Sequence, residues 1–274
     1  MNKYAIIFSA ENRVIKDTFD SNGSAPNEKM AIGLAYSIRQ FHQDIDVYCG
    51  CFTQNTLSKY TQDWFKKLNV TYIEDPVFNT DSTVSCFLRT YCKDYFAERL
   101  LDQYDYLIYV DWDVVQLAPI TFNFNPMSPL VIVDTMPQWV LNYHKEFLPN
   151  LKTQLYYNWI DIINPYNRHL FSMDWTDPAI INYHNSDVLL SNRIADSQLQ
   201  IIEQDIGSYN VSKPLTDRTL FHHYDTLGPD GSFYKIKELY PELYQKYFLF
   251  FEKVLNIKVQ NQPGYWEDVA KEHE

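Results

Sequence analysis

Apolar and polar residues follow two different periods in the first 110 residues of the chain. Short apolar runs, such as residues 4–9 and 106–110, have the length and composition of buried β-strands. Longer stretches between such runs repeat their apolar residues with helical spacing, as residues 28–41 do after a polar loop at 20–27. The pattern predicts strands at 4–9, 45–52, 70–73 and 106–110, and helices at 28–41, 56–68 and 84–101.

This order of strands and helices predicts an α/β fold with a mainly parallel, Rossmann-like central sheet and helices on both faces. The pattern is less regular after residue 110, where further strands are expected at 130–133 and within 186–191, and helices at 199–206 and from 242 onward. No repeat, low-complexity stretch or linker interrupts the chain. We therefore expect a single domain over residues 1–274, with two halves at about 1–135 and 136–274.

Two carboxylates, Asp111 and Asp113, directly follow the apolar run 106–110 and precede the apolar pair Val114 and Val115. Ligands of open parallel sheets bind beyond the carboxyl ends of the strands, so the two acids are expected at a binding site. An unpaired buried carboxylate costs several kcal/mol, which a divalent cation such as Mg²⁺, Mn²⁺ or Ca²⁺ can offset. The pattern predicts a metal site; the alternative is that one of the two acids caps a helix.

The formal net charge of −12 at pH 7, without a basic cluster, argues against nucleic acid as a partner. No apolar run reaches the roughly 18–20 residues of a membrane-spanning helix, and the N-terminal run is too short for a secretory signal. The four cysteines, Cys49, Cys51, Cys86 and Cys92, have the spacing of neither zinc ligands nor a disulfide framework. We expect them to be buried thiols in a reducing, cytoplasmic compartment.

The chain has only seven glycines and lacks both Gly-x-Gly-x-x-Gly and a Walker-type Gly-Lys-Ser/Thr. A glycine-rich phosphate loop is therefore not expected. If the ligand carries phosphates, a metal and side chains must hold them, and a cation on Asp111 and Asp113 can do so by neutralising charge on phosphate oxygens.

Six short motifs follow one another along the chain. They are Phe8-Ser9-Ala10-Glu11, Phe87-Leu88-Arg89 with Tyr91, Tyr109-Val110-Asp111-Trp112-Asp113, Asn185-Ser186-Asp187-Val188-Leu189-Leu190, Glu203-Gln204-Asp205 and His222-His223-Tyr224. Their types and order resemble those of nucleotide-sugar glycosyltransferases with the GT-A fold, in particular the group that contains glycogenin and the bacterial lipopolysaccharide galactosyltransferases. The resemblance extends from about residue 4 to about residue 225.

The resemblance implies a donor site in the half formed by residues 1–135. The loop with Phe8, Ser9, Ala10 and Glu11 would hold the base and ribose of the nucleotide, and Arg89 would contact the donor. The segment Asp111-Trp112-Asp113 corresponds to the family's Asp-x-Asp, whose carboxylates bind the metal that holds the diphosphate. His223 would complete the metal shell, although His222 competes for this role. An imidazole ligand favours Mn²⁺ over Mg²⁺.

The resemblance also implies that the half formed by residues 136–274 binds the acceptor. Asn185 begins a segment similar to the family's Asn-Ala-Gly-Val-Leu-Leu strand, and Glu203, Gln204 and Asp205 resemble an Asp-Gln-Asp that lines the sugar and acceptor side. Asp187, which stands where the family usually has glycine, is a further catalytic candidate. The aromatic residues that crowd 137–175 suit an aromatic-rich acceptor lobe.

The resemblance implies metal-dependent transfer of a sugar from a nucleotide diphosphate sugar, with a UDP-sugar expected, to a carbohydrate or other hydroxyl acceptor, with retention of configuration. Three alternatives remain: an inverting enzyme with Asp187 or Asp205 as general base, a sugar nucleotidyltransferase, and a non-catalytic sugar-binding protein. A sugar nucleotidyltransferase normally has a glycine-rich basic loop near the N-terminus, which this chain lacks. We expect no transmembrane segment; a peripheral membrane location and an oligomer are both compatible with the sequence.

Overall fold

The computed structural model describes residues 3–10, 12, 26–52, 56–75, 95–121, 131–132, 150–152, 160–172, 183–197, 199, 202–203, 207–209, 220–223 and 241–255. Within these ranges only the backbone is described for several residues, among them 131–132, 183–187, 202–203, 207–209 and 222–223. The predicted division into halves near residue 135 is not tested by the fold and stays a prediction.

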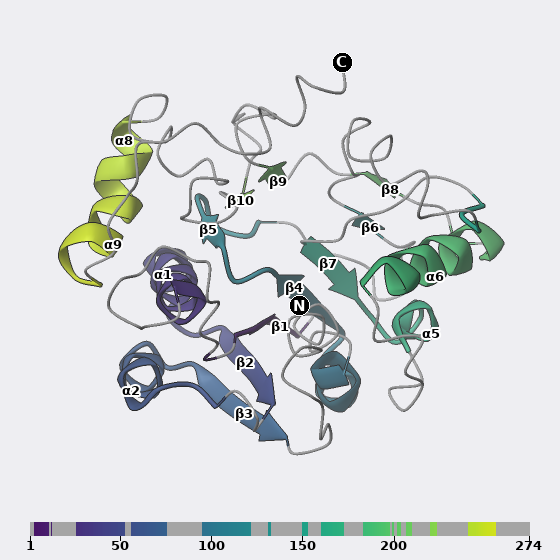
Figure 1. Ribbon diagram of the computed structural model, residues 1–274, viewed down its shortest axis with the longest axis horizontal. Helices are drawn as coiled ribbons and strands as arrows, with labels where there is room; N and C mark the ends of the chain where they lie inside the picture. Colours follow the sequence, from purple (N-terminus) through teal and green to yellow (C-terminus); the bar gives the residue numbers. More distant parts are fainter. Residues whose placement is uncertain are drawn as a thin grey trace.

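In the described part of the chain, one sheet has the strand order β3-β2-β1-β4-β7-β6-β8 (Figure 1). Its strands are β1 (Tyr4–Ser9), β2 (Asp46–Phe52), β3 (Thr71–Asp75), β4 (Tyr106–Val110), β6 (Val131–Ile132), β7 (Ile160–Ile163) and β8 (Ile202–Glu203). The pairs β3·β2, β2·β1, β1·β4 and β6·β8 are parallel, while β7 runs antiparallel to both neighbours. The prediction of an α/β fold with a mainly parallel sheet is confirmed.

The first half of the chain forms the elements that its periodicity predicts. Helix α1 (Pro26–Phe41) begins slightly before the expected residue 28, because proline is well suited to the first helical turn. Helix α2 (Lys59–Lys67) begins only after Ser58, whose hydroxyl accepts a hydrogen bond from the backbone N–H of Thr61. Residues 95–100 are helical and continue into a 3₁₀ turn, η2 (Leu101–Gln103); residues 84–94 of this expected helix lie outside the described residues.

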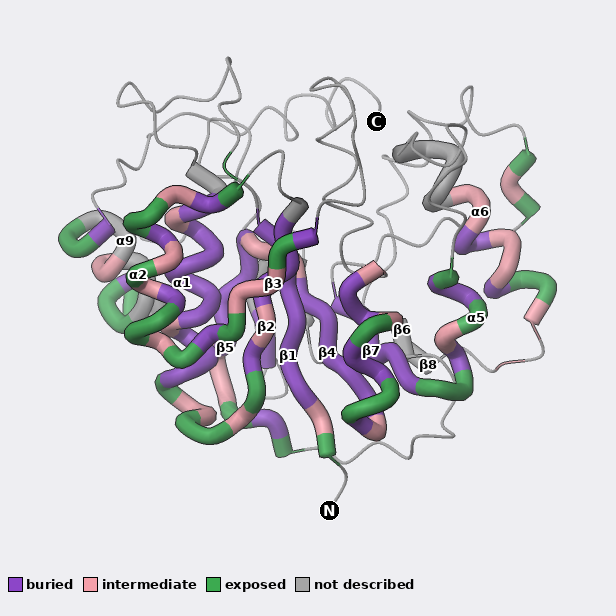
Figure 2. Tube along the Cα trace, turned by 90° about the horizontal axis from the view of Figure 1, so that it is seen from below, coloured by how far each residue is buried: buried purple, intermediate pink, exposed green. Residues whose placement is uncertain are grey.

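Alternating residues of the strands face two separate apolar cores, one on each side of the sheet. Ile6 and Phe8 pack with α1 and α2, whereas Ala5 and Ile7 pack with the helix at 95–100 and with two later helices, α5 (Arg168–Phe171) and α6 (Tyr183–Asp196). The central strands are therefore buried along their length (Figure 2). This confirms the prediction of helices on both faces, and it explains the continuous apolar runs.

The second half departs from the sequence prediction in two places. Residues 186–191 were expected in a strand but belong to α6, since Leu190, Ser191 and Ile194 are buried at helical spacing and Leu190 and Ile194 join the core under the sheet. Residues 202–203 were expected in a helix but form β8, the edge strand beside β6. In both segments the apolar run is too short to distinguish helical from strand periodicity, so tertiary packing determines the secondary structure.

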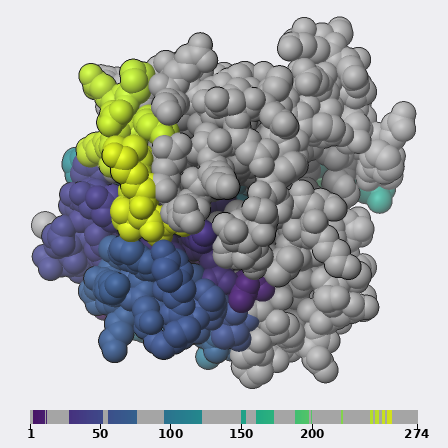
Figure 3. Space-filling model, turned by 60° about the vertical axis from the view of Figure 1, so that its left-hand side comes forward, coloured from purple at the N-terminus to yellow at the C-terminus, as the bar shows by residue number. Residues whose placement is uncertain are grey.

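A second, smaller sheet has the order β5-β10-β9, formed by β5 (Val114–Gln116), β10 (Phe221–His223) and β9 (Gly207–Tyr209). The expected C-terminal helical segment is present as α8 (Pro241–Leu243), a π-helical turn η4 (Tyr244–Phe248) and α9 (Leu249–Lys253). It lies against α1 and α2 (Figure 3), where Phe250 stacks on Tyr36 with ring centroids 4.1 Å apart and meets Trp64 edge-on. These contacts make Phe250 a packing residue.

Two further expectations can be compared with the described residues. Cys49 and Cys51 are buried thiols of β2, as predicted, while Cys86 and Cys92 lie outside the described residues. Each helix in the described ranges falls short of the length and apolarity needed to cross a bilayer.

Candidate active site

The candidate site lies where β4 ends, at the centre of the large sheet between β1 and β7. The parallel strands β1, β2, β3 and β4 all point their carboxyl ends toward the same edge (Figure 2). Asp111 and Asp113 follow the last residue of β4, so they lie at this edge, as the sequence predicts for a ligand site.

The two acids occupy different environments. The Asp111 side chain is half-buried, whereas Asp113 is only 5% exposed and directly precedes β5, the first strand of the small sheet. Trp112, between them, is half-buried and packs against the core shared with α1. Because strands β4 and β5 flank residues 111–113, neither acid stands at the start of a helix, and the interpretation of a local helix cap is wrong.

Tyr109 connects Asp111 to the interior of the sheet. Its hydroxyl donates a hydrogen bond of 2.6 Å to Oδ1 of Asp111, and it is also hydrogen-bonded to the Ser9 side chain on the neighbouring strand. Burial raises the pKa of Tyr109 well above its ordinary value, and the negative charge of Asp111 raises it further. The phenol therefore stays protonated and remains a donor.

Asp161 is a buried acid that the sequence analysis did not single out. It lies in β7 directly opposite Tyr109, is fully buried, and its charge contributes to the raised pKa of Tyr109. The signal was available in the sequence, because Asp161 interrupts the apolar run 160–163 much as Asp111 ends the run 106–110. Its complete burial keeps it from contacting a substrate directly, so it belongs to the support of the site.

His223 is brought to the acids by the small sheet. The antiparallel pairing of β10 with β5 sets His223 opposite Val114 and His222 opposite Val115. The backbone of His223 therefore lies beside the residue that follows Asp113, although the two are distant in sequence. Side chains of both histidines lie outside the described residues, so the choice between them stays a prediction.

The donor set at this edge fits a hard divalent cation. Carboxylate oxygens of Asp111 and Asp113 are suited to Mg²⁺ and Mn²⁺, and an imidazole is compatible with Mn²⁺. Among residues whose side chains are described, no three His, Cys, Asp or Glu converge as a metal-binding group. The register of β10 brings the backbone of His223 beside Val114, so His223 stays the predicted third ligand.

The predicted nucleotide loop is only partly described. Phe8 is fully buried and meets Phe65 of α2 edge-on, so its ring serves the core rather than a ligand. Ser9 is buried against Tyr109, and the N–H of Ala10 donates to the carbonyl of Gly50. The side chains of Phe8 and Ser9 are thus occupied by the core and by Tyr109, and nucleotide binding by this loop stays a prediction.

Several predicted residues lie wholly or partly outside the described residues. Glu11, Arg89, Gln204 and Asp205 lie outside it, and only the backbone of Asn185, Asp187 and Glu203 is described. Asn185 and Asp187 are in the first half of α6, not in a strand.

Glu203 takes part in a continuous row of residues across the sheet. It pairs with Ile132, which pairs with Asp161, which in turn pairs with Tyr109. This row links the edge strand β8 to the centre of the sheet, so the backbone of Glu203 stands at the same level along the strands as the Tyr109–Asp161 pair.

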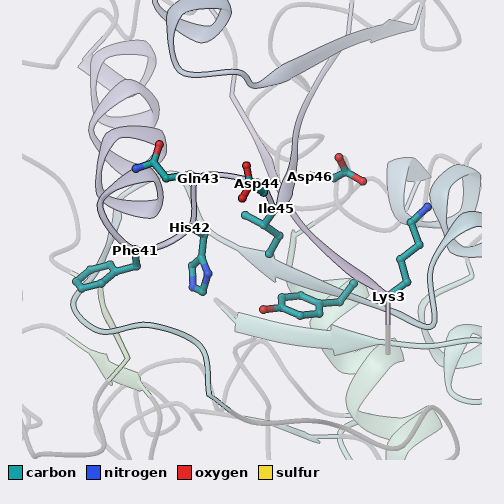
Figure 4. A pocket seen from close by; sticks show the side chains of 8 residues that line it. Lys3, Phe41, His42, Gln43, Asp44, Ile45 and Asp46 are labelled. Carbon is teal, nitrogen blue, oxygen red and sulfur yellow. The ribbon is translucent and has the colours of Figure 1, made fainter. Parts of the chain in front are cut away.

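A hollow lies at the other end of the parallel strands, away from the candidate site (Figure 4). It has a volume of about 480 Å³ and is lined by Lys3, Tyr4, Phe41, His42, Gln43, Asp44, Ile45 and Asp46. The hollow is wide open to solvent, and its acids Asp44 and Asp46 are exposed. It lies at the amino ends of the parallel strands, away from Asp111 and Asp113.

Comparison with known proteins identifies the fold. No protein-family model matches the chain, and no curated protein sequence matches it. Among solved structures, the bifunctional glycosyltransferase WbbM in its apo form matches 83% of this chain at 12% identity and a TM-score of 0.51. The chain spans about half of WbbM, since the match covers 47% of that protein.

A second solved structure matches most of both chains. The galactosyltransferase LgtC, in complex with donor and acceptor sugar analogues, matches 82% of this chain and 89% of its own length, at 13% identity and a TM-score of 0.50. Likeness at such low identity establishes the arrangement of elements but not the reaction. The chain has the GT-A type fold of these glycosyltransferases, as its motifs predict.

Proposed function

We propose that this protein is a glycosyltransferase that uses a divalent cation, Mn²⁺ or Mg²⁺, to move a sugar from a nucleotide diphosphate sugar to a hydroxyl group of a carbohydrate or other acceptor. UDP-sugars are the expected donors. The proposal rests mainly on one observation: the half-buried Asp111 and the buried Asp113 follow the central strand β4 at the carboxyl edge of a GT-A type sheet.

The position of the small sheet supports the metal part of the proposal. Strand β5 starts directly after Asp113, and its partner β10 carries His223 opposite Val114. Two carboxylates and one imidazole would then hold the cation. When bound, the cation would neutralise charge on the diphosphate that departs with the nucleotide.

The protein side chains would orient the donor and stabilise the charge that develops. Arg89, as a planar guanidinium, would bind donor oxygens in bidentate fashion. The bond between the anomeric carbon and the diphosphate oxygen breaks, the acceptor oxygen bonds to that carbon, and the acceptor's proton goes to the departing diphosphate. This proton path requires no enzymatic base, in agreement with the proposed retention of configuration.

An inverting reaction would need a carboxylate on the opposite face of the donor. Asp187 and Asp205 are the candidates for that base, and Glu203 and Gln204 would bind sugar hydroxyls. Asp161 is not among these candidates, because its side chain is fully buried in the sheet, where it lies opposite Tyr109. The stereochemistry of the product, read from its anomeric proton coupling, decides between the two.

A donor panel tests the proposal directly. Release of nucleoside diphosphate would be measured from several nucleotide sugars with Mn²⁺, with Mg²⁺ and with a chelator, each in the presence of mixed sugar acceptors. We expect release from one class of donor, supported best by Mn²⁺ and abolished by the chelator. LgtC, whose structure contains donor and acceptor sugar analogues, suggests sugars as the first acceptors to try.

Three other outcomes would contradict the proposal in different ways. Metal-dependent binding of a nucleotide sugar without turnover under any acceptor would indicate a sugar-binding protein. Absence of both binding and release for all donors would show that Asp111 and Asp113 do not form a nucleotide-sugar site. Release of pyrophosphate from a sugar phosphate and a nucleoside triphosphate would instead identify a nucleotidyltransferase.

A further inference from the structure

A buried polar chain leads from the first strand to the proposed metal site. Ser9 at the end of β1 is hydrogen-bonded to Tyr109 in β4, and Tyr109 donates to Oδ1 of Asp111. Ser9 and Tyr109 are each 1% exposed, whereas Asp111 is half-buried at the edge. These hydrogen bonds therefore join the buried interior of the sheet to a carboxylate just after the end of β4.

We propose that Tyr109 is a positioning residue that fixes the Asp111 carboxylate in the orientation needed to bind the cation. This inference rests on the function proposed above. The bond from the phenol to Oδ1 limits the rotamers open to the Asp111 side chain and so fixes how its carboxylate is oriented. Hydrogen bonds of this kind, behind the atoms that touch a metal, orient the ligand and typically change metal affinity about 10–100-fold when removed.

Tyr109 can fix the orientation of the Asp111 carboxylate because packing restricts the position of its own ring. The ring lies in the core between the sheet and the helix at 95–100, and its backbone is paired on one side with Ile7 and on the other with Asp161. A half-buried aspartate after a strand would otherwise sample several rotamers, and ordering it on metal binding would cost conformational entropy. Tyr109 reduces that cost by ordering the carboxylate in advance.

The chain offers a matched control for this hydrogen bond. Tyr104, just before β4, is 5% exposed. It donates a hydrogen bond of 2.6 Å to Oδ2 of Asp46, which lies at the amino end of β2 and thus at the other end of the parallel strands. Tyr104→Phe and Tyr109→Phe therefore remove the same kind of bond, of the same length, from a buried tyrosine to an aspartate. If both bonds only stabilise the fold, the two substitutions should lower stability to a similar extent and have similar effects on Mn²⁺ affinity. If Tyr109 positions Asp111, only Tyr109→Phe should lower Mn²⁺ affinity.

The experiment is a titration of Mn²⁺ alone, with free Mn²⁺ measured by electron paramagnetic resonance, on wild type, Tyr109→Phe, Tyr104→Phe and Asp111→Asn. We expect Tyr109→Phe to weaken Mn²⁺ binding about tenfold or more, and Tyr104→Phe to leave it within about twofold. Thermal unfolding of each variant verifies that the protein is folded at the temperature of the titration.

A double variant tests whether Tyr109 acts through Asp111. In the Asp111→Asn background, adding Tyr109→Phe should change Mn²⁺ affinity less than about twofold, because the carboxylate to be oriented is gone. An undiminished tenfold effect in that background would overturn the inference. Unchanged Mn²⁺ affinity in folded Tyr109→Phe would also overturn it, while leaving the proposed function intact.

Failure of the proposed function has a separate signature. If wild type bound Mn²⁺ no better than Asp111→Asn, the metal site itself would be refuted, and the role of Tyr109 with it. The titration thus separates loss of the site from loss of its positioning residue.

Discussion

The two ends of the parallel strands use the same chemical groups for different purposes. At each end a buried tyrosine donates a 2.6 Å hydrogen bond to an aspartate, from Tyr109 to Asp111 at the carboxyl end and from Tyr104 to Asp46 at the amino end. At the amino end the Asp46 side chain is exposed to solvent. At the carboxyl end Asp113 is buried next to Asp111, and burying a carboxylate is costly. Among the described residues the aspartates at the two ends thus differ in burial, and the carboxyl end is where the proposed function places the ligand.

The buried polar group at the amino end holds the fold together instead. The guanidinium of Arg39, 7% exposed, donates to five backbone carbonyls, at His42, Gln43, Ile45, Leu68 and Asn69. These bonds join the end of α1, the turn before β2 and the turn between α2 and β3. The comparison predicts that substitutions at the carboxyl end reduce activity and that those at the amino end reduce stability.

The largest expected effect is the loss of transfer in Asp113→Asn. Removing a charge that would hold the proposed cation should lower kcat/KM about 1,000-fold, the upper range for deleting one preorganised electrostatic contact in an active site. The matched variant is Asp46→Asn, which should retain activity within about twofold because Asp46 lies at the other end of the sheet. The assay is donor-dependent release of nucleoside diphosphate, with unfolding midpoints measured alongside.

Similar results for Asp113→Asn and Asp46→Asn would contradict the proposed difference between the two ends of the strands. Equal losses of activity would mean that both ends contribute to catalysis. Full activity in Asp113→Asn would remove the acid from the proposed site.

Replacing Arg39 with methionine should have the next largest effect, on stability. The substitution keeps an apolar stem but leaves several partly buried carbonyls without their donor, and we expect a loss of about 3 kcal/mol in the free energy of unfolding. Arg39→Lys, which keeps the charge but not the planar fork, should lose less. Urea unfolding gives the free energies, and Mn²⁺ affinity measured well below the midpoint should match wild type. A large drop in affinity would show that the two ends are coupled.

The sequence predicts the parallel half of the fold well, because each buried strand there is a continuous apolar run. The runs at 4–9 and 106–110 become β1 and β4 with little change in their ends. The segment 186–191 becomes helical because Leu190 and Ile194 pack on the sheet at helical spacing, which a three-residue apolar run does not reveal. Local pattern therefore determines the central strands, and tertiary packing determines the shorter elements around them.

The candidate site is predicted less completely, for a different reason. Asp111 and Asp113 can be recognised because they end a strand, and their placement follows from the chain alone. The pairing of Tyr109 with Asp161, and of His223 with Val114, depends on strand register between distant segments. The burial of the Phe8 and Ser9 side chains likewise depends on α2 and β4, which a motif cannot show.

Substitution of Gly50 tests how tightly the strands are packed near the carboxyl end. A Cβ atom at Gly50 would lie 2.2 Å from Cδ2 of Phe96 in the helix at 95–100, a distance that requires the ring or the helix to move. We expect Gly50→Ala to lower the free energy of unfolding by about 2 kcal/mol through overpacking. Adding Phe96→Leu should recover part of the loss by making room. If the double variant lost more free energy of unfolding than the two single variants lose together, steric conflict would not be the cause.

The smallest expected effect concerns His42 at the amino end, and it depends on pH. Nε2 of His42 accepts a hydrogen bond of 3.0 Å from the N–H of Ile120, so the folded protein needs the neutral ring. Burial lowers the pKa of His42 below its ordinary value of 6.5, and the charge of Arg39 lowers it further. The folded state therefore binds fewer protons than the unfolded one. The stability that His42 contributes is complete above about pH 6.5 and is lost as the pH falls through the folded pKa.

Replacing the ring by one without an acceptor tests this dependence. His42→Phe should cost about 1 kcal/mol at pH 7.5, since the Ile120 N–H loses its acceptor. The difference between wild type and variant should shrink from pH 7.5 to pH 5, because His42 binds a proton more readily in the unfolded state than in the folded state. Transfer activity at pH 7.5 should be unchanged. A difference that stayed constant from pH 7.5 to pH 5 would mean that His42 contributes through packing alone. Reduced transfer in a fully folded His42→Phe would instead extend the functional region to the amino end of the sheet.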